Sequence, residues 1–170
     1  FDTKFKKDEE GYDIFSTLWK YDCNPADYKK DKDGKIIKYP AAEGLSEIIA
    51  TPTYYNGKVY VAIGQDPEHG EGVGCLSCIE ADTGKKVWEF KKIKRTISTC
   101  AVDASNGLLF AADYSGYVYC LDAESGELHW VYDQKAHMWG YPLVADGKVY
   151  IGDEDGDFVV LASDKKMKLL

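Results

Sequence analysis

The feature that most limits how this chain can fold is a sequence pattern that recurs about every 40 residues. One half of the pattern runs from a glycine through an apolar stretch, and it occurs at residues 74–81, 116–123 and 156–163. Gly74 and Gly116 are 42 positions apart, and Gly116 and Gly156 are 40 apart. Such a period is typical of proteins that stack one small structural unit on the next.

Each repeat unit begins with two apolar segments separated by a short turn sequence. The turn sequences are Asn56-Gly57, Asn106-Gly107 and Asp146-Gly147. A type I′ turn needs positive φ at both central residues, a conformation that Asn, Asp and Gly tolerate. We therefore predict a β-hairpin with a two-residue turn at each position.

The units end on a tryptophan that follows a Thr-Gly or Ser-Gly pair. Trp88 and Trp130 are 42 positions apart, an earlier copy of the ending is present at Trp19, and residues 164–170 contain no Trp. A large aromatic ring can fill the gap between neighbouring sheets. We predict that these tryptophans wedge between adjacent units.

Four short strands in each unit predict an all-β protein, a β-propeller of four-stranded antiparallel blades. Hydrophobic residues make up 45% of the chain and aromatic residues 14%, a composition that favours strands. An immunoglobulin-like sandwich would not explain the period. The expected division is the end of a preceding blade at 1–22, an insertion at 23–47, blades at 48–95 and 96–138, and a truncated blade at 139–170, all in one propeller domain.

Charge and hydropathy exclude some classes of partner. The formal net charge is −8 and the isoelectric point is about 4.9, which argues against a nucleic-acid-binding face. The basic stretch between residues 91 and 95 is short and fits a solvated connection. No apolar run approaches the ~18 residues of a transmembrane helix, and no signal peptide is visible.

Residues 81–88, and with substitutions 123–130, resemble the Ala-x-Asp-x-x-Thr-Gly-x-x-x-Trp signature of PQQ-like propellers of the quinoprotein and BamB type. That family includes dehydrogenases dependent on pyrroloquinoline quinone (PQQ) and a non-catalytic outer-membrane assembly lipoprotein. A closer likeness, from Trp19 onward, is to large bacterial PQQ-binding-like propeller proteins of the Planctomycetes type, carried by residues 18–25, 48–52, 61–74 and 147–157.

The resemblance implies a ring of six to eight blades, of which this chain holds about three and a half. The missing blades would come from the rest of a longer chain or from a second copy. The resemblance also implies a periplasmic or cell-envelope location in a bacterium.

The longest departure from the blade pattern is the predicted loop at residues 65–73, between the second and third strands of a unit. Asp66, Glu68, His69 and Glu71 supply oxygen and imidazole groups that could bind Ca²⁺ or a transition metal. A solvated acidic loop is the alternative. The stretch 31–35 opens like a calcium loop but lacks the later ligands, so we interpret it as a charged surface excursion.

A second candidate is the segment before the third hairpin. It contains His137 and Trp139, and this tryptophan is additional to the repeat. An imidazole and an indole near the propeller axis could contact a planar ligand such as a quinone. A buried aromatic plug beside the channel is the alternative.

Five cysteines give no clear indication of disulfide bonds. Cys75 and Cys78 form C-x-x-C, but strand residues three apart point to opposite faces. Cys100 and Cys120, on the first and third strands of a blade, would be about 9.6 Å apart, beyond disulfide reach. We expect most of the five to be small buried apolar residues.

These patterns favour a non-catalytic scaffold that binds a protein or small ligand at its loops. The first alternative is part of a PQQ-dependent dehydrogenase, which the resemblance allows and which would need PQQ, Ca²⁺ and a catalytic base. Those dehydrogenases often carry two adjacent cysteines, and this sequence has none. The second alternative is a carbohydrate- or peptide-binding propeller.

Overall fold

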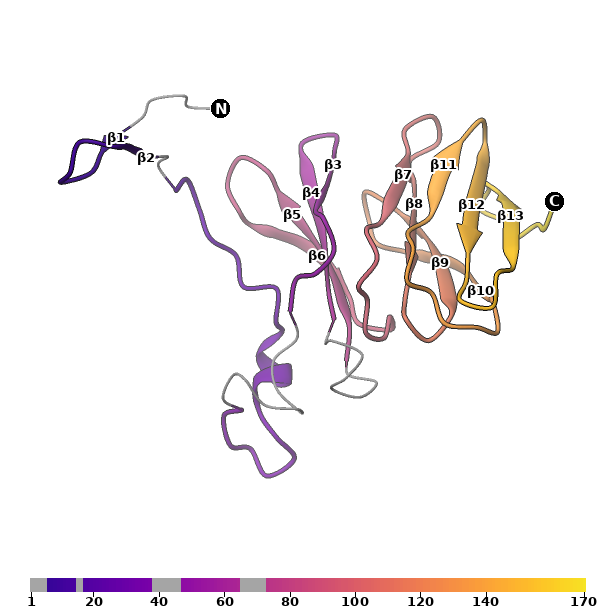
Figure 1. Cartoon of the computed structure of the whole chain (residues 1–170), viewed down its shortest axis with the longest axis horizontal. Helices are drawn as coiled ribbons and strands as arrows, with labels where there is room; N and C mark the ends of the chain where they lie inside the picture. Colours follow the sequence, from indigo (N-terminus) through magenta and orange to yellow (C-terminus); the bar gives the residue numbers. More distant parts are fainter. Residues whose placement is uncertain (1–5, 15–16, 38–46, 65–72) are drawn as a thin grey trace.

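A computed structural model describes residues 6–14, 17–37, 47–64 and 73–170 (Figure 1). The elements are β1 (Lys6–Lys7), β2 (Asp13–Ile14), the 3₁₀ turn η1 (Ala26–Lys29), β3 (Thr53–Tyr55), β4 (Lys58–Ile63), β5 (Cys75–Glu80), β6 (Lys86–Phe90), β7 (Ala101–Asp103), β8 (Leu108–Ala112), β9 (Tyr117–Asp122), β10 (Leu128–Asp133), β11 (Leu143–Ala145), β12 (Lys148–Gly152) and β13 (Phe158–Ala162). No helix of the described residues is long and apolar enough to cross a membrane.

After the small two-stranded sheet of β1 and β2, three larger antiparallel sheets follow one another along the described part of the chain. Of these three, the first sheet has the strand order β3-β4-β5-β6, the second β7-β8-β9-β10, and the third β11-β12-β13. Each is a simple meander in which consecutive strands pair, and the sheets stand next to one another in chain order (Figure 1). The predicted all-β architecture of propeller blades is confirmed.

The second sheet is buried on both faces, because successive apolar side chains of its strands point alternately to the two neighbouring sheets. In β8, Leu109 and Ala111 pack toward the first sheet, whereas Leu108, Phe110 and Ala112 pack toward the third. Side chains alternate between the two faces of a strand, so a strand covered on both sides becomes a continuous apolar run. The stacking of sheets therefore follows from the sequence of this central strand.

The predicted hairpin turns form at two of the three positions as expected. Asn56 and Gly57 have φ of 46° and 73°, and Asp146 and Gly147 have 50° and 67°. These positive values at both central residues are those of a type I′ turn.

The prediction of a two-residue turn at Asn106-Gly107 is wrong. Asp103 pairs with Leu108, so four residues form this turn, and only Gly107 has positive φ. The Asp103 carbonyl accepts the Gly107 N–H at 2.8 Å, and its carboxylate accepts the Ser105 N–H at 3.0 Å. An Asp side chain that bonds the backbone two residues later starts a longer turn.

Trp88 and Trp130 lie between neighbouring sheets as predicted. Trp88 of the first sheet donates its Nε1–H to the Ala123 carbonyl of the second, at 3.1 Å. A Cβ placed on Gly126 would lie 2.7 Å from the Trp88 ring, too close for any side chain, so this glycine is required where the ring docks. Trp19 repeats the arrangement against the first sheet, donating to the Ala81 carbonyl at 2.8 Å and packing on Gly84.

The segment before the first sheet covers that sheet's outer side. Tyr21, Cys23 and Tyr28 pack with apolar residues of β4 and β5 in a core cluster of their own. Asp31 closes the following turn locally, because its carboxylate accepts the Asp33 and Lys35 N–H groups at 2.9 Å each.

Candidate functional site

The connections between successive sheets lie at the strand ends opposite the hairpin turns, beside the turns that join β8 to β9 and β12 to β13 (Figure 1). We call this end of the sheets the connection face. Backbone hydrogen bonds hold each connection to a neighbouring turn. Tyr114 N–H donates to Arg95 O at 2.9 Å, and Glu154 N–H donates to His137 O at 3.0 Å. Arg95 and His137 therefore occupy equivalent positions in two successive connections.

Side chains from both connections meet on the ring of Tyr114. The Arg95 guanidinium carbon lies 4.1 Å from the ring centre, a cation–π contact. The His137 ring stacks on Tyr114 with centres 4.4 Å apart and an 11° interplanar angle. Trp139 meets Tyr114 at 90°, with centres 5.1 Å apart. Together with Glu154 these residues form what we call the stacked cluster.

Glu154 completes the stacked cluster through both carboxylate oxygens. Oε1 lies 2.8 Å from His137 Nδ1, and Oε2 accepts the Trp139 Nε1–H at 3.0 Å. The hydrogen bond from Trp139, followed by that from His137, lowers the pKa of Glu154. The carboxylate is therefore ionised at neutral pH, and His137 acts as the donor through Nδ1 because an ionised carboxylate only accepts.

The outer part of the stacked cluster is open to solvent. The side chains of His137 and Glu154 are 47% and 39% exposed, and Trp139 is 53% exposed. Met138 between them is fully buried, and its N–H donates to the Tyr114 carbonyl at 3.3 Å. The alternation turns His137 and Trp139 outward while Met138 anchors the segment. Within the described residues these two side chains are therefore half-exposed, and the alternative of a buried plug beside the channel stays a prediction.

The structure brings the predicted cofactor contacts His137 and Trp139 together, and both already contact other side chains of the stacked cluster. His137 is already stacked on Tyr114, and Glu154 already accepts from both residues. In residues 6–14, 17–37, 47–64 and 73–170, no group of three or more His, Cys, Asp or Glu could hold a metal ion. The polar and aromatic groups of this segment thus already contact one another within the described residues.

The predicted metal ligands Asp66, Glu68, His69 and Glu71 lie outside the described residues. Their role stays a prediction from the sequence.

Three members of the stacked cluster were not identified from the sequence: Arg95, Tyr114 and Glu154. The repeat itself holds a signal for them. Arg95 and His137 are 42 positions apart, and Tyr114 and Glu154 are 40 apart, which are the spacings of the blades. From the 42- and 40-residue spacings one could have predicted that each connection lies next to a turn of the following sheet. The spacings do not show which side chains are in contact.

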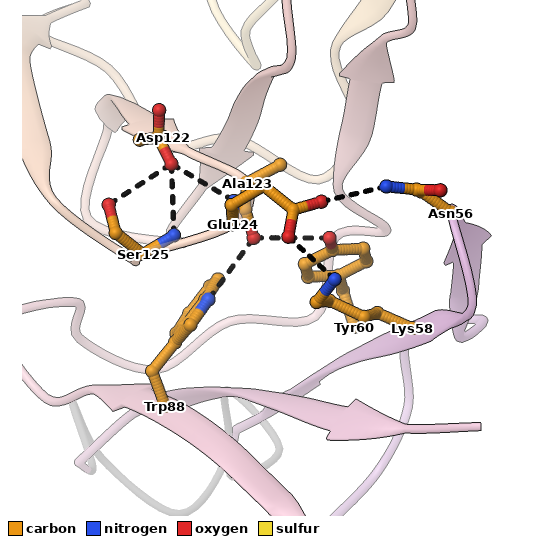
Figure 2. A network of polar contacts seen from close by, with 8 residues as sticks. All are labelled: Asn56, Lys58, Tyr60, Trp88, Asp122, Ala123, Glu124 and Ser125. Carbon is orange, nitrogen blue, oxygen red and sulfur yellow. Dashed lines mark hydrogen bonds and ion pairs between the residues drawn. The ribbon is translucent and has the colours of Figure 1, made fainter. Parts of the chain in front are cut away.

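A second concentration of polar contacts lies at the hairpin end of the first and second sheets. Figure 2 shows Asn56 Nδ2 and Lys58 Nζ donating to Glu124, at 3.0 and 2.6 Å, while the Tyr60 hydroxyl donates to the Ala123 carbonyl at 3.1 Å. The same carbonyl accepts from Trp88. These contacts join one sheet to the next, so we interpret this network as structural.

The cysteines contribute packing. All five are free and buried. Cys75 and Cys78 belong to different core clusters on opposite faces of the first sheet, as expected from their spacing. Burial raises the pKa of the Cys78 and Cys100 thiols to about 11, so both are protonated at neutral pH.

Comparisons with known proteins agree with this architecture. Residues 72–167, more than half of the chain, match the family model described as outer membrane protein assembly factor BamB. Tetrathionate hydrolase of Acidithiobacillus ferrooxidans is 29% identical over 133 residues, which are 78% of this chain and 24% of that protein.

Solved structures show the same fold. BamB of Moraxella catarrhalis superposes with a TM-score of 0.57 at 18% identity, covering 74% of this chain and 35% of that one. A quinohemoprotein alcohol dehydrogenase of Pseudomonas putida gives 0.55 at 19% identity, covering 72% of this chain and 20% of that one.

This chain thus spans between about a fifth and a third of the length of these relatives. Identities this low support a common fold only, whereas the family match covers the second and third sheets directly. The chain is therefore a PQQ-like β-propeller protein and belongs to the family described as outer membrane protein assembly factor BamB.

Proposed function

We propose that this chain is part of a non-catalytic β-propeller that binds a protein partner as an assembly scaffold in the cell envelope. The observation that carries the proposal is the stacked cluster on the connection face. It presents the half-exposed indole of Trp139, which is held by Glu154, on closely packed sheets. Interfaces between proteins rely on such rigid aromatic anchors, because little conformational entropy is lost when they bind.

The family match supports the same proposal. The description of the matching family is that of an assembly factor, and the match covers the residues that form the stacked cluster. The cell-envelope location is part of this proposal and is tested by fractionation of cells that express the tagged protein.

The outer face of the third sheet offers a second contact surface, one that suits another blade. Tyr150 occupies the position that Tyr60 and Phe110 hold in the other two sheets, where both are fully covered. Around Tyr150, Leu143 and Phe158 are 55% and 68% exposed and line a depression of about 520 Å³. We propose that a further blade, from a longer chain or a second copy, covers this face.

Site-specific photo-crosslinking in cells tests the scaffold proposal. The complete natural protein would carry a photo-reactive amino acid at Asp155, beside Glu154 on the connection face, or at Asp146 in the third hairpin turn at the opposite end. We expect a defined covalent product with another protein from position 155, little from position 146, and a loss of the product when Trp139→Ala is added.

Reconstitution of the purified protein with PQQ and Ca²⁺ tests the alternative, a dehydrogenase. Uptake of the quinone with alcohol-dependent dye reduction, together with no cross-linked protein from position 155, would overturn the proposal in favour of a dehydrogenase. Sugar binding that protects position 155 from cross-linking to protein would favour a carbohydrate-binding propeller.

A further inference from the structure

We propose that Trp139 and Glu154 form a receptor for one cationic side chain, lysine or arginine, of the protein partner. This inference rests on the proposed scaffold function and names the chemistry of its contact. The two connections use equivalent positions for different contacts.

At the connection between the first and second sheets, the cation is built into the chain. Arg95 is buried, and its guanidinium carbon lies 4.1 Å from the centre of the Tyr114 ring. The cation that contacts this ring therefore comes from the chain itself. At the next connection the same two positions hold His137 and Glu154. The aromatic residue and the charged residue have exchanged places, and the charge is now negative.

The negative charge at this second connection is fixed in place. The two hydrogen bonds from His137 and Trp139 orient the Glu154 carboxylate at the surface. Among the described residues, His137 is the one basic side chain within ion-pair distance of Glu154. A carboxylate in this position can accept further hydrogen bonds, since each oxygen has more than one lone pair.

The aromatic surface beside this carboxylate belongs to Trp139. The Tyr114 ring is already engaged by Arg95 and by His137, whereas Trp139 meets it at 90° and stays half-exposed. Ile97 occupies the equivalent position in the preceding connection, 42 residues earlier, so the large ring is specific to this connection. An indole next to a carboxylate suits a cation on a hydrocarbon stem, because the stem packs on the ring while the charge meets the carboxylate.

Charge beyond the site favours the same ligand. Asp155 and Asp157 follow Glu154 in the exposed turn, and the chain carries a net charge of −8. Asp153 is used internally, since it accepts from Gln134 at 2.8 Å and from the Asp157 N–H at 2.9 Å. The carboxylates of Asp155 and Asp157 would raise the rate of encounter with a basic partner, while Trp139 and Glu154 provide the specific contact.

The test uses the complete protein labelled with 5-fluorotryptophan, with the resonance of residue 139 assigned from the W139F variant. The probes are short peptides that differ at one position, with lysine, arginine or the uncharged isostere norleucine. We expect the lysine and arginine peptides to shift this resonance saturably, with millimolar dissociation constants, and the norleucine peptide to bind at least about fivefold more weakly.

Matched variants separate the specific contact from general charge. Glu154→Gln should weaken the lysine peptide by about three- to tenfold, while Asp155→Asn, the same charge change in the same turn, should weaken it less than about twofold. Equal effects of the two variants, equal binding of the norleucine peptide, or a shift with glucose but not with lysine would each overturn the inference. Circular dichroism of both variants confirms that the fold is intact.

The same variants distinguish failure of this inference from failure of the proposed function. If cross-linking from position 155 continues at wild-type level in Glu154→Gln, the scaffold proposal stands and the cationic contact is wrong. If no partner is captured and the protein oxidises an alcohol with PQQ and Ca²⁺, the proposed function itself is wrong.

Discussion

The two interfaces between sheets have the same aromatic framework but different polar contacts. In the first interface, between the first and second sheets, Tyr60 lies 5.9 Å from Trp88 at 46°. In the second interface, between the second and third sheets, Phe110 lies 5.8 Å from Trp130 at 43°. The repeat therefore preserves the position of the rings even where the residue type changes.

The polar contacts around these rings follow different chemistry. The first interface uses an exposed ion pair, Lys58 with Glu124, and the Tyr60 hydroxyl. The second uses a buried carboxylate, because Asp103 accepts from the Ser163 hydroxyl at 2.5 Å across the interface. Apolar packing thus sets the spacing between blades, while the polar groups can vary once that spacing exists.

The largest expected effect is the loss of a wedged tryptophan. Trp88→Ala and Trp130→Ala should each lower the free energy of unfolding by about 3–5 kcal/mol, with the larger loss at the more buried Trp130. Urea denaturation of the complete protein measures this loss. Trp139→Ala removes an exposed ring outside both interfaces and should cost less than about 1 kcal/mol. A similar cost at all three positions would contradict the shared framework.

The next effect concerns the buried carboxylate of the second interface. Ser163→Ala removes a hydrogen bond to Asp103 and should lower the free energy of unfolding by about 1.5–3 kcal/mol. Burial opposes ionisation of Asp103, but hydrogen bonds from Ser105 and Ser163 outweigh it and lower its pKa. A lowered folded-state pKa contributes stability above the unfolded value, and that contribution is lost as the pH falls.

Measuring the stability of the wild-type protein and of Ser163→Ala at several pH values provides a control for this second prediction. Between about pH 5 and pH 3 the wild-type protein should lose more stability than Ser163→Ala, because the variant has already lost part of the Asp103 contribution. Parallel acid curves for the two proteins would show that the Asp103–Ser163 contact is unimportant.

A smaller effect distinguishes the two equivalent aromatic residues. Tyr60→Phe removes the hydroxyl that donates to the Ala123 carbonyl and should cost about 1 kcal/mol. The reciprocal change, Phe110→Tyr, should not stabilise the second interface, because Phe110 is fully buried and the equivalent carbonyl of Ser163 already accepts from Asn106 at 3.0 Å. A gain in stability for Phe110→Tyr would show that the two interfaces accept the same polar contacts.

The smallest effect is that of the exposed ion pair. Glu124→Gln should cost at most about 1 kcal/mol, and high salt should reduce the cost, because the Glu124 side chain is 53% exposed. The hydrogen bond from Lys58, then that from Asn56, lowers the pKa of Glu124, so its contribution is also lost as the pH falls.

The matched control for this ion pair is Lys148→Met. Lys148 occupies the position of Lys58 in the third sheet but pairs with Asp146 in its own turn, at 2.8 Å. Its loss should leave both interfaces unchanged. An effect of Lys148→Met as large as that of Glu124→Gln would mean that the contact across the first interface adds nothing specific.

Most of the fold could be predicted because the deciding patterns are local and repeated. The apolar runs of β4 and β8, the turn residues Asn56-Gly57 and the docking of Trp88 all followed from the period. The turn before Leu108 could not be predicted from Asn106-Gly107 alone, because Asp103 competes for the backbone and lengthens the turn. Local side-chain hydrogen bonds of this kind do not show in a dipeptide pattern.

The sequence by itself determined that the chain forms stacked sheets with tryptophans between them, because alternating apolar residues and a constant spacing dictate which faces must leave water. Only the tertiary structure decided that Arg95, Tyr114, His137 and Glu154 meet, since they lie on four separate segments of the chain. Those contacts depend on how far one sheet is displaced and turned against the next. That displacement is set by the packing of whole sheets, and no single segment encodes it.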